Sequence, residues 1–180
     1  MGRLGRLPVE LPEGVSAELK EGVVEFKGPK GAVALKLSKN ITVTLENGKL
    51  VVARKSDSKR ALAMHGTIRS HLANIVHGIS EGWTKKLLIS GPGYRGEVKD
   101  NTLHLSVGYS HPVIIEAPER VSFKVEKNLI TVEGIDKQVV GQTAALVRDS
   151  RRPNVYTGSG ISYEDEQVRR KAGKQTAGGE

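Results

Sequence analysis

Apolar and polar residues alternate along several short stretches of the chain. In residues 41–45, the apolar side chains of Ile41, Val43 and Leu45 are separated by threonines. This period of two predicts a strand that buries one face. A similar run over residues 121–125 is also followed by a turn and a second apolar run. Both stretches therefore predict hairpins of antiparallel strands.

Two other stretches carry apolar residues at helical spacing. The first follows Ser56, Asp57 and Ser58, residue types that cap helix N-termini. Its apolar positions recur every three or four residues and so share one helix face, namely Ala61, Met64, Ile68, Leu72, Ile75 and Ile79. A shorter helix is predicted after Asp136, with an apolar face that includes Val140 and Val147.

These elements recur in the same order along the chain. Gly28 and its match Gly108 are each followed by an apolar run, a strand, a turn, another strand and a helix. The repetition predicts an α+β fold of two tandem related modules, each a mainly antiparallel sheet with one packed helix. We expect the modules at residues 1–82 and 83–152. Residues 153–180, which are poor in apolar side chains, are expected to form an extended basic C-terminal tail.

Composition narrows the class of protein. The 180 residues include 28 Lys and Arg against 20 Asp and Glu, a formal net charge of +8, which favours an anionic partner. No apolar run approaches the roughly 18–20 residues of a membrane helix, and no secretory signal is visible. The absence of cysteine excludes disulfides and cysteine-based zinc sites. We therefore expect a cytoplasmic protein without a membrane partner.

No pattern of residues predicts an enzyme. Residues 91–96 match a dinucleotide-binding glycine pattern by letters, but that mechanism needs a helix to follow, and a strand fragment and turn follow here. A glycine-rich hairpin loop is expected, with a nucleotide-dependent enzyme as an alternative. His65, His71 and His77 recur every six residues, so they do not share the helix face that a zinc site requires. No catalytic residue, cofactor or metal is expected.

Cationic residues gather at helix starts, loops and the tail, where they are placed to follow a phosphate backbone. The chain has only two Phe, one Trp and four Tyr, so base stacking is not expected to dominate binding. The pattern favours recognition of structured RNA through its backbone and shape. Composition alone does not separate RNA from DNA.

Six motifs in a fixed order resemble the bacterial form of the large-subunit ribosomal protein six family, over nearly the whole chain. Each motif is weak alone, but the ordered set is specific. The motifs occupy residues 28–31, 65–67, 93–95, 108–113, 134–142 and 168–174.

The resemblance implies a non-enzymatic structural component of the large ribosomal subunit. It implies binding to 23S rRNA near the stalk base and the translation-factor docking region, with neighbouring large-subunit proteins and translation factors close by. Neither DNA nor a second copy of the chain is an expected partner. The alternative is an RNA-binding assembly factor that is not retained in mature ribosomes.

The resemblance also implies which residues contact rRNA, with the second module dominant. In that module and the tail these are Lys86, Tyr94, Arg95, Ser110, His111, Lys137, Arg148, Arg151, Arg152, Tyr156, Gly158, Gly160, Arg169, Arg170 and Lys171. A secondary set in the first module comprises Lys59, Arg60, His65 and Arg69.

The chain departs from the family pattern near its end. Thr157, Ser159 and Ser162 stand where the family carries basic residues, and residues 175–180 replace terminal lysines. We expect the contacts of the tail with RNA to persist but to be weaker and less sensitive to salt than in a typical relative.

Overall fold

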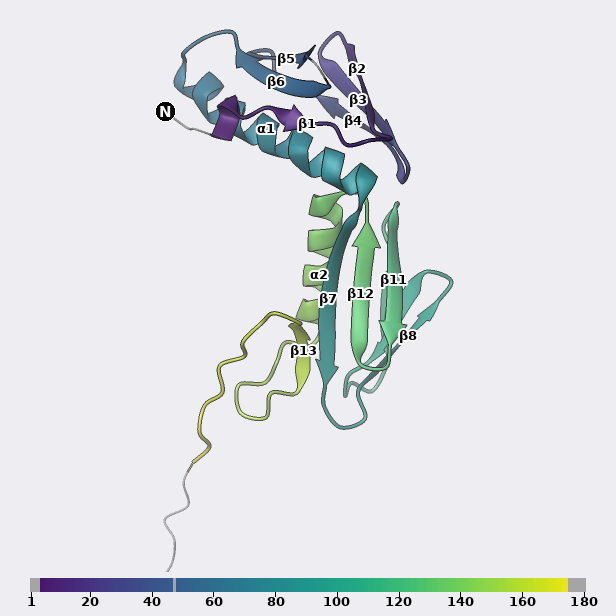
Figure 1. Ribbon diagram of the computed structural model, residues 1–180. Coiled ribbons are helices and arrows are strands. Elements are labelled where there is room, and N and C mark those ends of the chain that lie inside the picture. Colours follow the sequence, from purple (N-terminus) through teal and green to yellow (C-terminus); the bar gives the residue numbers. More distant parts are fainter. Residues whose placement is uncertain (1–3, 47, 175–180) are drawn as a thin grey trace, which may run out of the picture. The chain divides into compact units, whose positions relative to one another are not determined.

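The computed structural model describes residues 4–46 and 48–174 and divides into two compact units, labelled by element in Figure 1. The first unit comprises Met1–Trp83 with Ile135–Lys137, and the second comprises Thr84–Gly134 with Gln138–Glu180. Ile135 belongs to the first unit because its side chain packs against the hydrophobic core of that unit. Within the described residues, no helix is long and apolar enough to cross a membrane.

The first unit contains two three-stranded sheets and a long helix. The sheet orders are β1-β6-β5 and β2-β3-β4, and all of their paired strands are antiparallel. The elements are η1 (Leu4–Arg6), β1 (Val9–Glu10), β2 (Ser16–Lys20), β3 (Val23–Gly28), β4 (Gly31–Lys36), β5 (Ile41–Glu46), β6 (Lys49–Arg54) and α1 (Lys59–Ser80).

Helix α1 begins where the capping residues predict. Ser58 is the N-cap, and its hydroxyl accepts a hydrogen bond from the backbone N–H of Ala61 at 3.2 Å, which satisfies one donor of the first turn. The predicted apolar face is confirmed, because Ile68 and Leu72 are buried while Met64 packs at the edge of the core. The burial of this face against the strands holds the unit together.

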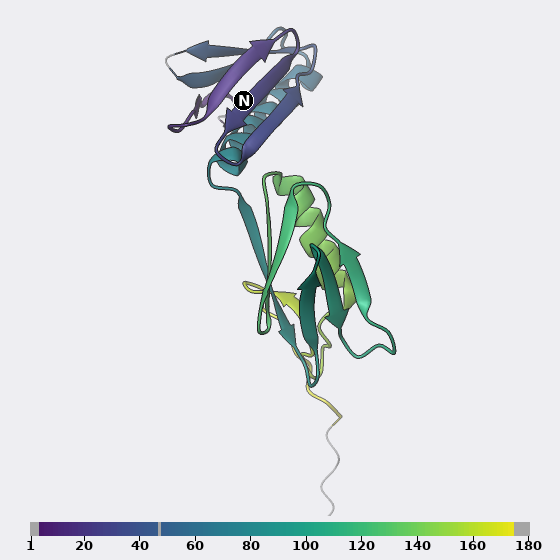
Figure 2. The ribbon, with the colours of Figure 1, turned by 90° about the vertical axis from the view of Figure 1, so that its right-hand side faces the viewer.

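The second unit repeats this plan with one strand more. Its sheets have the orders β11-β12-β7-β13 and β10-β9-β8, and α2 packs beside the larger sheet (Figure 2). The elements are β7 (Trp83–Ser90), β8 (Arg95–Lys99), β9 (Thr102–Ser106), β10 (Val113–Glu116), β11 (Val121–Glu126), β12 (Leu129–Gly134), α2 (Lys137–Ser150) and β13 (Gly160–Tyr163).

The strand orders confirm the α+β fold and the two related modules. The order β2-β3-β4 recurs as β8-β9-β10, and β1-β6-β5 recurs as β7-β12-β11. The helix follows β6 in one unit and β12 in the other. In both units the strands are divided between two sheets.

Part of the segment expected as an extended tail forms a strand. β13 pairs antiparallel with β7, with Gly160 opposite Ser90 and Tyr163 opposite Leu87. Ile161 is fully buried and is the only aliphatic side chain of this strand. A single aliphatic residue cannot form an alternating apolar pattern, so β13 could not be predicted from the sequence. Residues 175–180, which replace the terminal lysines of the family, lie outside the described residues.

Candidate nucleic-acid interface

The glycine-rich loop between β7 and β8 presents Tyr94 to the loop between β9 and β10. Gly93 has a φ of 73°, a backbone conformation that glycine favours. A Cβ on Gly108 would lie 3.2 Å from the Tyr94 ring, so the missing side chain of Gly108 leaves room for the two loops to approach. The element after Tyr94 is β8, and no helix N-terminus follows the glycines as dinucleotide binding would require.

The β9–β10 loop is joined to the end of α2 through Tyr109. The Tyr109 hydroxyl donates a hydrogen bond to the Ser150 carbonyl at 3.2 Å. The guanidinium carbon of Arg151 lies 5.0 Å from the centre of the Tyr109 ring, within the range of a cation–π contact. The His111 ring is nearly parallel to that of Tyr109, with centroids 6.5 Å apart. Tyr109 is 47% exposed, so this arrangement lies at the surface.

Arg151 is held in place without being neutralised. Hydrogen bonding to the side chain of Tyr109, and then to that of Tyr94, raises the pKa of Arg151 above its ordinary value. Among residues 4–46 and 48–174, no carboxylate forms an ion pair with Arg151. A fixed guanidinium without an acid partner is suited to bind a phosphate oxygen.

The loop between α2 and β13 is also preformed. The Asn154 side chain accepts hydrogen bonds from the backbone N–H groups of Tyr156 at 2.8 Å and Thr157 at 3.4 Å, an Asx turn. Gly160 has a φ of 148°, and a Cβ there would lie 2.7 Å from the Arg152 carbonyl oxygen. The loop therefore keeps a fixed shape and leaves Tyr156 exposed.

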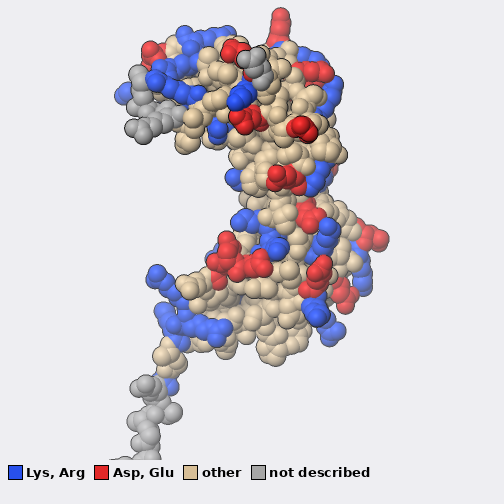
Figure 3. All heavy atoms as spheres, viewed as in Figure 1, with Lys and Arg blue, Asp and Glu red and all other residues tan. Residues whose placement is uncertain are grey.

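The basic segment Arg169, Arg170 and Lys171 lies beside this loop. The Lys171 N–H donates to the Val155 carbonyl at 2.8 Å, and the Arg170 guanidinium covers Gly158, where a Cβ would lie 2.5 Å from Nη2. All three cations are exposed. Figure 3 shows basic side chains gathered at the end of the second unit from which this segment leaves.

One acidic residue, Glu166, anchors the chain just before the same segment. Glu166 accepts hydrogen bonds from Nε of Arg148 at 2.8 Å and from the Tyr163 backbone N–H at 3.2 Å. The Arg148 hydrogen bond is the main cause that lowers the pKa of Glu166. We call Glu166 with its two donors the Glu166 clip. It fixes the point from which the basic segment extends.

Two other predicted cations also have acid partners. Arg152 donates to Asp149 at 2.9 Å, and Lys86 lies 3.7 Å from Glu164. Together with Arg148, these residues are partly neutralised within the second unit. Arg95, at the start of β8, and Ser110 and His111, in the β9–β10 loop, are exposed.

The remaining predicted residues lie in the first unit. Lys137 donates to Asn74 Oδ1 at 3.3 Å and lies over the Trp83 ring. Arg69 is tied to the N-terminal segment through the Leu7 and Pro8 carbonyls. Lys59 and Arg60 are exposed at the start of α1.

His65 is the predicted contact that the structure removes from the surface. Its side chain is 7% exposed, and Nε2 lies 2.9 Å from the Val52 carbonyl oxygen. A ring that is buried and bonded within the core is not available to RNA, so His65 is a structural residue. No cluster of metal-ligating side chains occurs in the described part of the chain.

Sequence reasoning missed two residues that shape the interface, Tyr109 and Asn154. Tyr109 lies inside the recognised motif at residues 108–113, but its contact with α2 comes from a distant part of the chain. Asn154 follows Pro153 and precedes a glycine-rich stretch, and this residue order is a turn signal that would have identified it.

Comparison with known proteins shows the family of the chain. A family profile described as Ribosomal protein L6 matches residues 11–82 and 90–164. A protein of Syntrophomonas wolfei, named Large ribosomal subunit protein uL6, is 49% identical over 180 residues, which cover 99% of each chain. Proteins of the same name are 47% identical in Thermus thermophilus, over 98% of this chain and 99% of the relative, and 44% identical in Nitratidesulfovibrio vulgaris, over 97% of each. These matches confirm the resemblance that the six motifs predicted, and the chain belongs to the ribosomal protein L6 family.

Proposed function

We propose that this protein is a structural, non-enzymatic component of the large ribosomal subunit, and that it binds 23S rRNA near the stalk base and the translation-factor docking region. The names of its full-length relatives support the assignment to the subunit. The RNA contact rests mainly on one observation: Arg151 is fixed by two tyrosines and has no acid partner among the described residues.

The contact surface that we propose is the end of the second unit. Cations supply attraction to phosphate, and the glycine loops let the RNA backbone approach the protein backbone. Its residues are Tyr94, Arg95, Tyr109, Ser110, His111, Arg151, Tyr156, Gly158, Arg169, Arg170 and Lys171. The predicted contact Gly160 is buried and instead shapes the loop before β13. Arg148, Arg152 and Lys86 shape this surface through their acid partners.

The first unit makes a smaller contribution to RNA binding. Lys59 and Arg60 are its exposed candidates. Because they lie at the start of α1, where the helix dipole is positive, they present a local positive potential to RNA. Neighbouring large-subunit proteins complete the environment of the protein in the cytoplasmic ribosome.

A tethered probe tests the proposed surface. The chain has no cysteine, so a single introduced thiol is a unique attachment point for an iron chelate that cleaves nearby RNA. Ser110→Cys and Thr157→Cys place the probe in the two exposed loops. Ser122→Cys, on an exposed face of β11, is the control. In reconstituted subunits, we expect strong cleavage of 23S rRNA at the stalk base from the loop positions and weaker cleavage from Ser122→Cys. Stronger cleavage from Ser122→Cys would reject the surface.

Sedimentation separates the structural role from the alternative of an assembly factor. A structural component is present in mature large subunits at one copy per particle and resists a high-salt wash. An assembly factor is found with precursor particles and is lost from mature subunits. The match over nearly the whole chain to relatives named as large-subunit proteins favours the structural role.

A further inference from the structure

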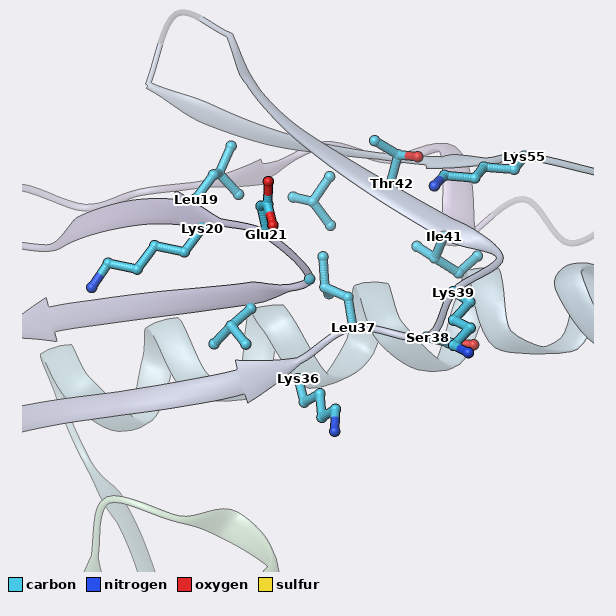
Figure 4. Close-up of a pocket in the computed structure, with 13 residues that line it drawn as sticks. Leu19, Lys20, Glu21, Lys36, Leu37, Ser38, Lys39, Ile41, Thr42 and Lys55 are labelled. Carbon is cyan, nitrogen blue, oxygen red and sulfur yellow. The ribbon is translucent and has the colours of Figure 1, made fainter.

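A groove opens in the first unit between its two sheets, and none of the residues that line it is an RNA contact proposed above. Its volume is about 630 Å³, and its walls are the end of β2 with the turn into β3 and the loop that joins β4 to β5. Figure 4 shows Leu37 on the loop between Leu19 of β2 and Ile41 of β5. Three separate segments of one unit therefore converge on the groove.

The floor of the groove is apolar and reachable from solvent. Leu37 is half-buried and packs against the core of the unit. Ile41 and Val43 are buried beneath it, whereas Leu19 is 43% exposed. An exposed leucine that continues a buried apolar floor offers a partner aliphatic surface to cover.

The rim of the groove is strongly cationic. Lys20, Lys36, Lys39 and Lys55 line it, against the single acid Glu21. Only Lys20 has an acid partner, Glu25 at 2.6 Å. In the portion of the chain that the structure describes, the other three lysines form no ion pair.

Two lysines of the same sheets outside the groove are paired with acids, Lys27 with Glu18 at 2.9 Å and Lys49 with Glu10 at 2.6 Å. Within the described residues, Lys30 and Lys59 also form no ion pair, but neither lies at the groove. The groove is distinguished by three unpaired lysines around an open apolar floor. We propose that the groove docks an acidic protein segment that carries leucine-like side chains, with its carboxylates on the lysines and its aliphatic groups on Leu19 and Leu37.

The residues that line the groove favour protein over nucleic acid. None of them is arginine or aromatic. Nucleic-acid sites use arginine forks and aromatic platforms to hold phosphates and bases, and the surface around Arg151 and Tyr109 has both. Lysines above an aliphatic floor match carboxylates and aliphatic side chains instead.

A titration of the full-length, isotope-labelled protein, followed by NMR, tests the proposal. The probe is a soluble synthetic peptide in which leucines are spaced among glutamates. We expect it to shift the backbone amide signals of Leu19, Leu37 and Ile41. Two matched peptides, one with serine in place of leucine and one with lysine in place of glutamate, are expected to bind at least about tenfold more weakly.

Charge reversal on the rim provides the second measurement. Lys36→Glu combined with Lys39→Glu should weaken binding of the glutamate–leucine peptide by about tenfold. Lys127→Glu, an equally exposed reversal in the turn between β11 and β12, should leave the affinity unchanged. Equal binding of the serine peptide, an equal loss in Lys127→Glu, or tighter binding of a short RNA at the same amides would overturn the proposal.

Discussion

The two units share a strand order, but they use their matching loops differently. In the first unit, β3 and β4 are joined by Pro29 and Lys30 alone, which leaves only a tight turn. In the second unit, residues 107–112 separate β9 from β10 and carry Tyr109 to the end of α2. The extra length, rather than a change of fold, gives the second unit the surface that we propose for RNA.

The matching glycines of the two units illustrate the same difference. A Cβ on Gly28 would lie 2.0 Å from Cγ2 of Ile79, so this glycine makes room for helix packing. Gly108 has a φ of 81° and faces the Tyr94 ring, so it shapes a loop. One position of the repeat serves the core in the first unit and the surface in the second.

The unit with the proposed RNA surface is not the unit with the higher net charge. Residues 1–82 hold 13 cations and 8 acids, whereas residues 83–180 hold 15 cations and 12 acids. In the second unit, however, the acids pair with particular cations and leave Arg151 and Arg169 without acid partners within the described residues. Placement of cations therefore matters more than their number for the proposed RNA contact.

The largest expected effect comes from the strand that only the second unit has. Gly160→Ala places a Cβ against the Arg152 carbonyl at a φ that L-residues rarely adopt, and we expect it to destabilise this unit by about 2–4 kcal/mol. Hydrogen exchange at Leu88 and Ser162, which are opposite each other in β7 and β13, measures the loss. Gly141→Ala, on α2 with open space around the new Cβ, should instead stabilise by up to about 1 kcal/mol. Equal exchange in both variants would refute the strain.

A matched pair of double variants tests the division of RNA binding between the units. Arg169→Ala with Lys171→Ala should weaken binding to 23S rRNA by about tenfold and reduce the salt slope by about 2. Lys59→Ala with Arg60→Ala removes the same charges from the first unit and should cost no more than about threefold. Filter binding over a range of salt concentrations measures both quantities. A larger loss from the first-unit pair would reverse the comparison.

Adding cations to the loop between α2 and β13 should strengthen RNA binding by the second unit. Thr157→Lys with Ser159→Lys returns basic residues to the loop held by Asn154, and we expect about fivefold tighter RNA binding with a steeper salt slope. Thr42→Lys with Thr44→Lys, on the exposed face of β5, adds equal charge to the first unit and should change the slope less. If the lysines introduced at positions 157 and 159 leave the salt dependence of RNA binding unchanged, the loop does not contact phosphate.

The smallest effect is expected at the Glu166 clip. Because the folded-state pKa of Glu166 is lowered, its ionised form stabilises the fold at neutral pH, and this contribution is lost as pH falls through the folded-state pKa. Glu166→Gln should reduce RNA affinity by about threefold at neutral pH. Its difference in stability from the unmodified protein should vanish at acidic pH.

A matched change in the first unit controls for general charge effects. Glu10→Gln breaks the ion pair with Lys49, and this pair is solvent-exposed, so we expect little change in stability or RNA affinity. Urea titrations at several pH values compare the two variants. A pH-independent difference between Glu166→Gln and the unmodified protein would show that the clip does not act through its charge.

Much of the fold was predictable because it depends on local patterns. The cap at Ser58 is three residues from Ala61, and successive apolar positions of the helix face from Ala61 to Ile79 are three or four residues apart. The spacing even placed His65 on that face, four residues after Ala61 and three before Ile68. The periodicity therefore indicated that His65 is buried, but histidine is a polar residue type that is often exposed, so it was predicted as a surface contact.

The interface was less predictable because its contacts join distant parts of the chain. Arg148 and Arg151 were both predicted as RNA contacts, yet Arg148 is paired with Glu166 whereas Arg151 is held by tyrosines. Which cation remains unpaired depends on the tertiary structure that brings residues 94, 109 and 166 to the end of α2. No local sequence pattern predicts which of the two arginines is paired with an acid.

The position of β13 in the chain also sets an order of events during synthesis. β7 is made before β8 to β12 and α2, and its pairing strand β13 follows all of them. Until β13 emerges from the ribosome, one edge of the larger sheet has unpaired backbone groups, a state prone to association with other chains. The segment that carries Arg169 to Lys171 emerges after β13. In a nascent chain, the strand that closes the larger sheet therefore emerges before the basic segment at residues 169–171.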